Sequence, residues 1–293
     1  MPVEPLHPDL LRMLDTCRAG RHFQAAEWVE AKCTKLNDYM RRCGLKGCVT
    51  SVSGGIDSAV VLALCAHAMR MPGSPIEKNI GLCQPIHSSD WALQRGKENI
   101  AACGATAVVV DQTALHTALS TLVEEAVGIA GKGFARGQLR SYMRTPPGFY
   151  VAQLCSQEGI PSIVMGTGNK DEDFYLGYFC KAGDGVVDVQ LISDLHKSEV
   201  FQVAAVLGVP LNTRSAAPSA DLWEEQTDED ELGFPYDFVE LFTGWYRVQT
   251  ETAKLRFLDT LSAAAREQFE RYTKACEDVH RRNAHKLSGP VNL

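Results

Sequence analysis

The chain reads Cys48-Val49-Thr50-Ser51-Val52 and continues Ser53-Gly54-Gly55-Ile56-Asp57-Ser58, and this stretch decides the fold. Residues 48–52 are apolar and rich in β-branched side chains, which predicts a buried strand. After Ser58 the apolar residues recur at helical spacing. The stretch is therefore predicted to be a strand, a glycine turn and the start of a helix.

The glycine turn has the chemistry of a phosphate-binding loop. A helix start leaves backbone N–H groups unpaired and carries partial positive charge, and glycine lets the backbone approach a phosphate closely. Ser53 and Ser58 add hydroxyl donors. Because Asp57 would repel a phosphate, we expect a Mg²⁺ ion between the two. The turn is not a Walker loop, since no lysine follows the glycines. The competing interpretation is a tight turn in which Asp57 caps the helix.

Composition bounds the class of protein. The chain has 293 residues, of which 45% are hydrophobic and 22% are charged, enough for one large α/β domain with appendages. A net charge of −7 without a basic cluster argues against nucleic acid as a partner. No apolar stretch reaches membrane-spanning length, and no secretory signal is visible. The ten cysteines form no Cys-x-x-Cys or zinc spacing, so we expect reduced core residues in a cytoplasmic protein.

Strand and helix patterns alternate after an N-terminal helical extension at residues 1–46, expected to form a hairpin against the sheet or a partner chain. The predicted strands are 48–52, 79–86, 106–110, 161–165 and 186–189, and the predicted helices between and after them are 89–103, 114–127, 139–157 and 194–207. This order predicts an α/β fold with a doubly wound, parallel five-stranded sheet. Residues 47–293 are expected to form a single domain, with a mobile loop at 212–233 and a helical C-terminal segment at 236–280.

A second candidate constellation follows the fourth predicted strand, at residues 166–172. Ligands of such sheets bind at the carboxyl ends of the strands, so the loops after the first and fourth strands should converge. Thr167 could contact a nucleotide, and Glu172 could supply a second carboxylate for Mg²⁺. The competing interpretation is a plain loop with acidic residues near a helix start.

Three further charged positions need an explanation. Asp184 is compatible with simple turn chemistry. Asp188 falls within a predicted apolar strand, where an unpaired charge is costly, so it needs a protein cation or a ligand hydroxyl as partner. Lys197 lies in the first turn of a predicted helix and opposes the helix dipole, which a bound phosphate would explain. The acidic run at residues 228–231 is expected to be a solvated helix start rather than a metal site.

With these motifs the chain resembles the ammonia-dependent NAD synthetases of the N-type ATP pyrophosphatase superfamily, whose fold is adenine nucleotide alpha-hydrolase-like and Rossmann-like. The resemblance covers residues from about 48 to 290. It rests on residues 53–58, 166–172, 181–185 with Asp188, 192–197, 218–223, 226–233 and the pair His285-Lys286.

The resemblance implies a two-step reaction. The nicotinate carboxylate of deamido-NAD attacks the α-phosphorus of ATP and releases pyrophosphate, and ammonia then converts the adenylate to NAD and AMP. The resemblance also implies a homodimer. Only about 46 residues precede the first strand, too few for a nitrilase-like glutaminase domain, so free ammonia is the expected donor, although a separate glutaminase remains possible.

The resemblance also implies roles for individual residues. The expected catalytic residues are Asp57, Glu172, Lys197 and Asp184, with Asp57 and Glu172 as Mg²⁺ ligands and Asp184 facing the nicotinate and ammonia. The segment 212–233 would close over the site and exclude water. The expected ATP-binding residues are Ser51, Val52, Ser53, Gly54, Gly55, Ile56, Asp57, Ser58, Thr167, Lys197 and Ser219. The expected deamido-NAD-binding residues are Tyr142, Lys181, Asp188, His285 and Lys286.

Three positions depart from the family pattern. Tyr142, Ile86 and Leu287 stand where basic residues are common, and all three substitutions remove positive charge near phosphates. Arg140 or Arg144 could compensate. The alternatives are therefore a different N-type ligase, or a non-catalytic nucleotide-binding relative.

Overall fold

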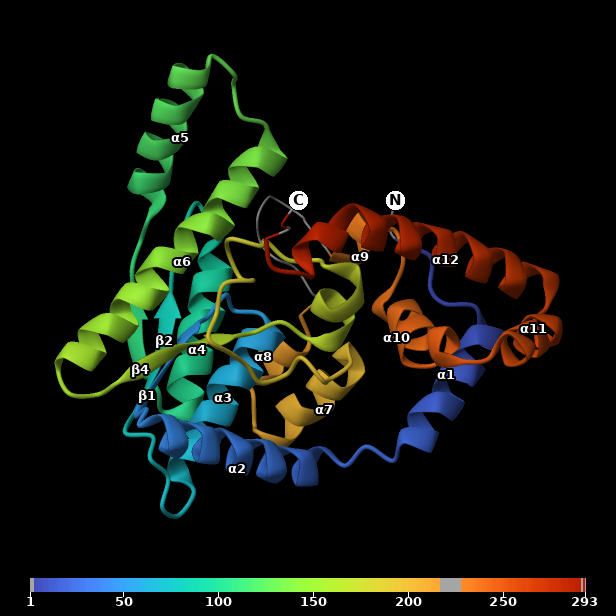
Figure 1. Cartoon of the computed structure of the whole chain (residues 1–293), viewed down its shortest axis with the longest axis horizontal. Coiled ribbons are helices and arrows are strands. Elements are labelled where there is room, and N and C mark those ends of the chain that lie inside the picture. Colours follow the sequence, from blue (N-terminus) through green and yellow to red (C-terminus); the bar gives the residue numbers. More distant parts are fainter. Residues whose placement is uncertain (1–2, 217–227, 291, 293) are drawn as a thin grey trace.

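The computed structural model describes residues 3–216, 228–290 and 292 (Figure 1). Its centre is a five-stranded sheet in which every neighbouring pair of strands is parallel, in the order β3-β2-β1-β4-β5. The strands are β1 (Gly47–Ser51), β2 (Lys78–Cys83), β3 (Thr106–Val109), β4 (Ser162–Gly166) and β5 (Val189–Gln190). The predicted doubly wound parallel sheet is confirmed, and its order reverses between β1 and β4.

Helices cover both faces of the sheet. On one face α2 (Ala25–Cys43), α3 (Ile56–Arg70) and α7 (Lys197–Val206) share a core with β1 and β4. On the other face α6 (Gly133–Gln157) packs against β1 and β4. Two further helices are α4 (Asp90–Cys103), which packs on α3, and α5 (Thr113–Val127), which packs on α6 and extends away from the sheet in Figure 1.

A second, aromatic core lies beside the sheet. It is centred on Phe234, Phe238, Phe242 and Phe269, which are fully buried. The elements around it are α1 (Pro8–Arg21), the π-helix η1 (Lys170–Leu176), α9 (Asp228–Leu232), α10 (Tyr236–Gly244), α11 (Glu251–Thr260) and α12 (Ala263–Asn283). The short elements α8 (Leu211–Arg214), η2 (Tyr246–Val248) and η3 (Ala284–Lys286) complete the described chain.

The predicted N-terminal hairpin is wrong. α1 packs on α10 and α12, where Leu10 and Leu14 are completely buried in the aromatic core. α2 instead packs on α3 and α7, with Cys33 and Met40 on its buried face. The two helices therefore separate because each has an apolar face that matches a different core (Figure 1).

Several predicted boundaries are also wrong. β2 ends at Cys83, just before Pro85, which cannot donate a backbone hydrogen bond to a sheet. α6 begins at Gly133, not at residue 139. β5 is only Val189–Gln190, so Asp188 lies in the bend before it. The expected mobile loop 212–233 has helical ends, α8 and α9, and its residues 217–227 lie outside the described residues.

All ten cysteines are free thiols, but only seven of them are buried as expected of core residues: Cys43 is exposed, and Cys17 and Cys103 are partly buried. No helix in the described ranges is long and apolar enough to cross a membrane.

Candidate active site

A cavity of about 630 Å³ opens beside the carboxyl ends of β1 and β4, where the strand order reverses. Its walls come from the loops after β1 and β4, from residues 178–187, and from α6 and α12. The two loops that the sequence predicted to converge therefore do so.

The glycine loop forms one wall of this cavity. Ser51–Ser58 line it, with the exception of Gly54. Ser53 and Ser58 hold the loop internally, because Gly55 N donates to Ser53 Oγ at 3.2 Å and Ser53 N donates to Ser58 Oγ at 3.3 Å. Gly54 has φ +88°, and a Cβ there would lie 2.5 Å from the carbonyl oxygen of Ala92. Only glycine fits this position.

Asp57 is not a helix cap, so the competing interpretation is wrong. The N-cap of α3 is Gly55, and Asp57 lies inside the first turn. Its Oδ2 accepts a hydrogen bond from Lys197 Nζ at 2.7 Å, and its Oδ1 accepts one from Asn169 Nδ2 at 2.9 Å. Lys197 Nζ also donates to Glu172 Oε1 at 2.8 Å. The three predicted residues Asp57, Glu172 and Lys197 therefore meet at one point.

Lys197 is the first residue of α7 and is buried. A bound phosphate was expected to explain its position, but its partners in the fold are the carboxylates of Asp57 and Glu172. Burial would lower the pKa of the Lys197 ammonium, but the nearby charges of Asp57, Glu172 and Asp228 outweigh burial and raise it. A lysine at a helix N-terminus is stable here because carboxylates surround it.

Carboxyl groups outnumber cations in the cluster around Lys197. Burial raises the pKa of Glu172 to about 7, and the charges of Asp57 and Asp228 add to this effect while Lys197 opposes it. Burial likewise raises the pKa of Asp228. One ammonium thus faces three carboxyl groups, which favours binding of a further cation.

Asp228 was missed in the sequence. The acidic run was expected to be solvated, but Asp228 is only 6% exposed and lines the cavity. Tyr236 links it to the site, because the Tyr236 hydroxyl lies 2.8 Å from Glu172 Oε1 and 3.2 Å from Asp228 Oδ2. Nothing in the local pattern distinguishes Asp228 from its acidic neighbours, since the fold alone brings α9 to this point.

Asn169 was also missed, although its pattern was visible. It caps η1, with Oδ1 accepting from the backbone N–H groups of Asp171 and Glu172 at 3.0 and 3.1 Å. An asparagine directly before an acidic helical turn is a typical N-cap. Here the cap also fixes Asp57, so it connects the two loops of the site.

Asp184 also lines the cavity, in the turn formed by residues 181–185. Its Oδ1 accepts hydrogen bonds from Cys180 N at 2.9 Å and from Ser141 Oγ at 3.3 Å. Its side chain faces the cavity, and the desolvation caused by the surrounding protein raises its pKa. Thr167 also lines the cavity.

Of the five residues expected to bind deamido-NAD, only Lys286 lines the cavity. Lys286 lines the cavity and donates to the carbonyl oxygens of Gly177 and Phe179 at 3.1 and 2.8 Å. Arg282, one turn earlier and not predicted, lines it as well. Tyr142, Lys181, Asp188 and His285 are not among the lining residues, and Ser219 lies outside the described residues.

These outlying side chains have partners in the fold. Lys181 Nζ donates to the carbonyl oxygens of His285 and Ser288, both at 2.8 Å. Tyr142 donates to Gln138 Oε1 at 3.4 Å. Asp188 was expected to need a cation or a ligand hydroxyl, but its Oδ2 accepts from the backbone N–H of Val164 at 2.8 Å. The partner in the fold is therefore a backbone amide of β4, and Asp188 is exposed in a bend and not enclosed in an apolar strand.

None of the three positions that depart from the family pattern lies in the cavity wall. Ile86 is completely buried, and neither Tyr142 nor Leu287 lines the cavity. Of the two arginines that could compensate, Arg144 lines the cavity and Arg140 does not.

No group of three or more His, Cys, Asp and Glu side chains within the described ranges could hold a metal ion by itself. A metal at this site would therefore need ligands from substrate phosphates as well as from the protein.

The sheet order, the Ser-Gly-Gly loop at the switch point and the paired carboxylates define an adenine nucleotide alpha-hydrolase-like protein. Comparison with known proteins is more specific. The family model described as NAD synthase matches residues 28–290. An NH(3)-dependent NAD(+) synthetase of Alkaliphilus oremlandii is 35% identical over 225 residues, covering 75% of this chain and 82% of that protein. The chain therefore belongs to the NAD synthase family.

Solved structures agree on the fold. An NMN synthetase from Francisella tularensis matches with a TM-score of 0.74 and 26% identity, over 92% of this chain and 99% of that one. An NH3-dependent NAD synthetase from Campylobacter jejuni matches with a TM-score of 0.67 and 21% identity, over the same shares of the two chains.

Proposed function

We propose that this protein catalyses the ATP-dependent amidation of deamido-NAD to NAD, with ammonia as nitrogen donor and AMP and pyrophosphate as the other products. The observation that carries the proposal is the meeting of the glycine loop with Asp57, Glu172 and Lys197 in one cavity. Family membership and the curated relatives named NH(3)-dependent NAD(+) synthetase support the choice of substrates.

In the first step an oxygen of the nicotinate carboxylate bonds to the α-phosphorus of ATP. The bond from that phosphorus to the bridging oxygen breaks, and pyrophosphate leaves with the electron pair. Such transfers depend on positioning and charge neutralisation. The loop N–H groups and the hydroxyls of Ser53 and Ser58 would hold the β- and γ-phosphates. Lys197 would face the α-phosphate, and Thr167 would contact the nucleotide.

In the second step ammonia bonds to the acyl carbon, and AMP leaves with one former carboxylate oxygen. The nitrogen must lose a proton to become an amide. Asp184 faces the cavity with a raised pKa. A carboxylate there can accept a hydrogen bond from the incoming nitrogen and take up that proton.

The donor set fits a Mg²⁺ ion held by Asp57 and Glu172. Two carboxylates with substrate phosphates are a usual magnesium environment, and the surplus of carboxyl groups around Lys197 favours another cation. When bound, the ion would neutralise charge on the phosphates.

We also propose a cytoplasmic homodimer. Support for the dimer comes from α5, the start of α6 and the loop between them, where large apolar side chains are exposed. They are Leu115, Leu122, Val123, Val127, Ile129 and Phe134. An exposed apolar surface of this kind is typical of a protein interface. The ten free thiols fit a reducing compartment.

A second candidate acceptor is nicotinate mononucleotide, which amidation would convert to NMN. Two observations favour it: the match to an NMN synthetase structure, and the absence of charge at Tyr142, Ile86 and Leu287. A mononucleotide has one phosphate fewer to neutralise.

The experiment compares AMP and pyrophosphate formation with deamido-NAD or nicotinate mononucleotide, and with ammonia or glutamine, in the presence of ATP and Mg²⁺. We expect turnover that requires ammonia and is faster with deamido-NAD. A higher kcat/KM for the mononucleotide would favour the second candidate, and no turnover with either acceptor would refute both.

A further inference from the structure

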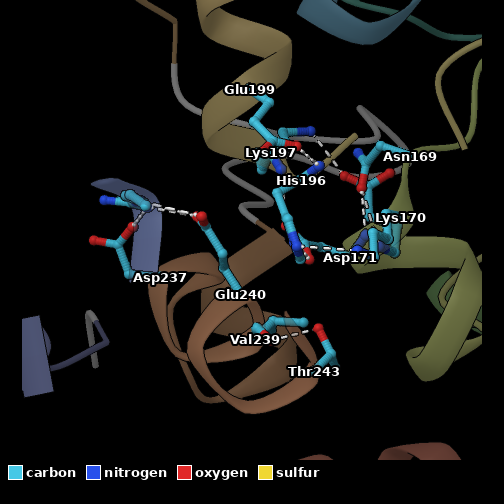
Figure 2. Close-up of polar contacts among 12 residues, drawn as sticks. Asn169, Lys170, Asp171, His196, Lys197, Glu199, Asp237, Val239, Glu240 and Thr243 are labelled. Carbon is cyan, nitrogen blue, oxygen red and sulfur yellow. Dashed lines mark hydrogen bonds and ion pairs between the residues drawn. The ribbon is translucent and has the colours of Figure 1, made fainter. Parts of the chain in front are cut away.

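The start of α7 is held by a buried carboxylate that lies outside the cavity wall. Asp171 Oδ2 accepts the backbone N–H of Lys197 at 2.8 Å, and Asp171 Oδ1 lies 2.7 Å from His196 Nδ1. Asp171 is fully buried and His196 is 1% exposed. Figure 2 shows these contacts beside the first turn of α7. The first N–H groups of a helix have no partner within the helix, so this carboxylate determines where Lys197 begins α7.

The imidazole of His196 is fixed at both nitrogens. Its Nε2 lies 3.2 Å from Lys170 Nζ. A lysine ammonium can only donate, so Nε2 accepts and Nδ1–H donates to Asp171. The backbone N–H of His196 donates to Glu199 Oε2 at 2.9 Å, so the Glu199 side chain also holds the start of α7. A Cβ on Gly244 would lie 2.8 Å from His196 Nε2, so α10 leaves the ring little room to move.

The π-helix η1 and the start of α7 contact each other at two places. Asp171 and Glu172 are neighbours in η1, and His196 and Lys197 are neighbours at the start of α7. In the cavity Glu172 meets the Lys197 ammonium, while outside it Asp171 meets His196 and the Lys197 backbone. The Asp171–His196 contact therefore fixes the register between η1 and α7.

We propose that Asp171 and His196 are positioning residues, which align the Lys197 ammonium with Asp57 and Glu172 for transfer at the α-phosphorus of ATP. The catalytic part of this inference rests on the proposed function. Misplacement of a reacting group by about 1 Å can cost about 100-fold in rate.

The test uses a pair of substitutions at His196 in the full chain. His196→Leu removes both ring hydrogen bonds, whereas His196→Asn keeps an N–H donor close to the place of Nδ1. We expect His196→Leu to lower kcat for AMP and pyrophosphate formation by about 100-fold, with KM for ATP within about 3-fold of wild type. His196→Asn should recover most of the lost kcat. Asp194→Asn is the matched control, because Asp194 lies in the same loop but pairs with Lys32, and kcat should not change.

A second readout is independent of activity. Hydrogen exchange of the backbone amides at the start of α7 should be faster in His196→Leu than in wild type, and close to wild type in His196→Asn. Unchanged exchange in His196→Leu would overturn the proposal, even if wild type shows no turnover and the proposed function has failed. With an active wild type, an unchanged kcat in His196→Leu, equal losses in both variants, or a loss confined to KM would also overturn it.

Discussion

At the scale of single residues, Lys197 is the common partner of the acidic side chains in the site. It is buried between Asp57 and Glu172, with Asp228 close enough to affect its pKa. A buried ion pair contributes little net stability when it is intact, but removing one partner leaves uncompensated charge and is costly. The folded state of the site therefore depends on this lysine.

Lys197→Met should destabilise the protein by about 3 kcal/mol at pH 8.5. The loss should be smaller at pH 5.5, because the raised pKa of Glu172, about 7, lets that side chain become neutral at the lower pH. Urea unfolding at the two pH values measures both quantities. Lys32→Met, which breaks an exposed pair with Asp194, should cost less than about 1 kcal/mol. An equal loss at both pH values would contradict this account of the charges.

The raised pKa of Asp173 makes the stability of the folded protein depend on pH. Burial, with the charges of Glu172 and Asp184, raises its pKa from 3.8 to about 8. For a carboxyl group whose pKa is raised by folding, the stability contribution is complete below the unfolded pKa and is lost as pH rises through the folded one. Asp173→Asn should therefore have a higher Tm than wild type at pH 9, and the difference should vanish near pH 4. The exposed Asp38→Asn is the control, and no gain at pH 9 would refute the prediction.

At this scale the sequence predicted the residues whose local pattern is distinctive. Asp57, Glu172 and Lys197 each stood in a motif that needed a ligand or a counter-charge, and the structure brings them together. Asp228 and Tyr236 could not be predicted, because only the tertiary fold brings α9 and α10 to Glu172. Asp188 was wrongly placed inside a strand, because the limits of β5 depend on its pairing with β4.

At the scale of elements, the loop between β1 and α3 depends on its backbone shape. Gly54→Ala would force a Cβ against the Ala92 carbonyl and strain a φ of +88°. We expect ATP affinity, measured by calorimetry, to fall by at least about 10-fold. Gly104→Ala is the control, since Gly104 has φ +73° at the end of α4 with open space around it. Gly104→Ala should lose about 1 kcal/mol of stability, and Gly54→Ala should lose more because of its clash with the backbone, but only Gly54→Ala should lose ATP affinity. Unchanged ATP affinity in Gly54→Ala would argue against a phosphate role for the loop.

The periodicity of apolar residues predicted the presence of the strands and helices better than it predicted their ends. Each of the five predicted strands overlaps one observed strand, because short β-branched runs are distinctive. Their ends depend on hydrogen-bond pairing, which explains the short β5. The π-helix η1 was not predicted, since no local pattern separates it from an ordinary helix.

At the scale of the whole molecule, the chain forms a sheet core and an aromatic helical core that share one cavity. α1 joins the second core and is tied to it by Arg18, which pairs with Asp237 and Glu240 at 2.6 Å each. Figure 2 shows the side chains of Asp237 and Glu240, which come from α10 and take part in this contact. The sequence predicted one domain with an N-terminal extension, and could not show that α1 and α2 belong to different cores.

The apolar surface of α5 and the start of α6 should hold two copies together. Leu122→Glu should convert a dimer to a monomer in sedimentation velocity, because a charge at a buried apolar interface is costly. Leu255→Glu, at a residue of similar exposure on α11, should leave the dimer intact. A wild-type monomer, or a dimer that survives Leu122→Glu, would contradict this assignment of the interface.

The proposed reaction begins with attack of the nicotinate carboxylate of the acceptor on the α-phosphorus of ATP. The most direct measurement uses deamido-NAD labelled with ¹⁸O in that carboxylate, together with ATP, Mg²⁺ and ammonia, and detects the products by mass spectrometry. We expect one ¹⁸O atom in each AMP, equal amounts of AMP, pyrophosphate and NAD, and loss of turnover in Asp57→Ala and Glu172→Ala proteins that remain folded. AMP without the label, or normal activity in either variant, would contradict this mechanism.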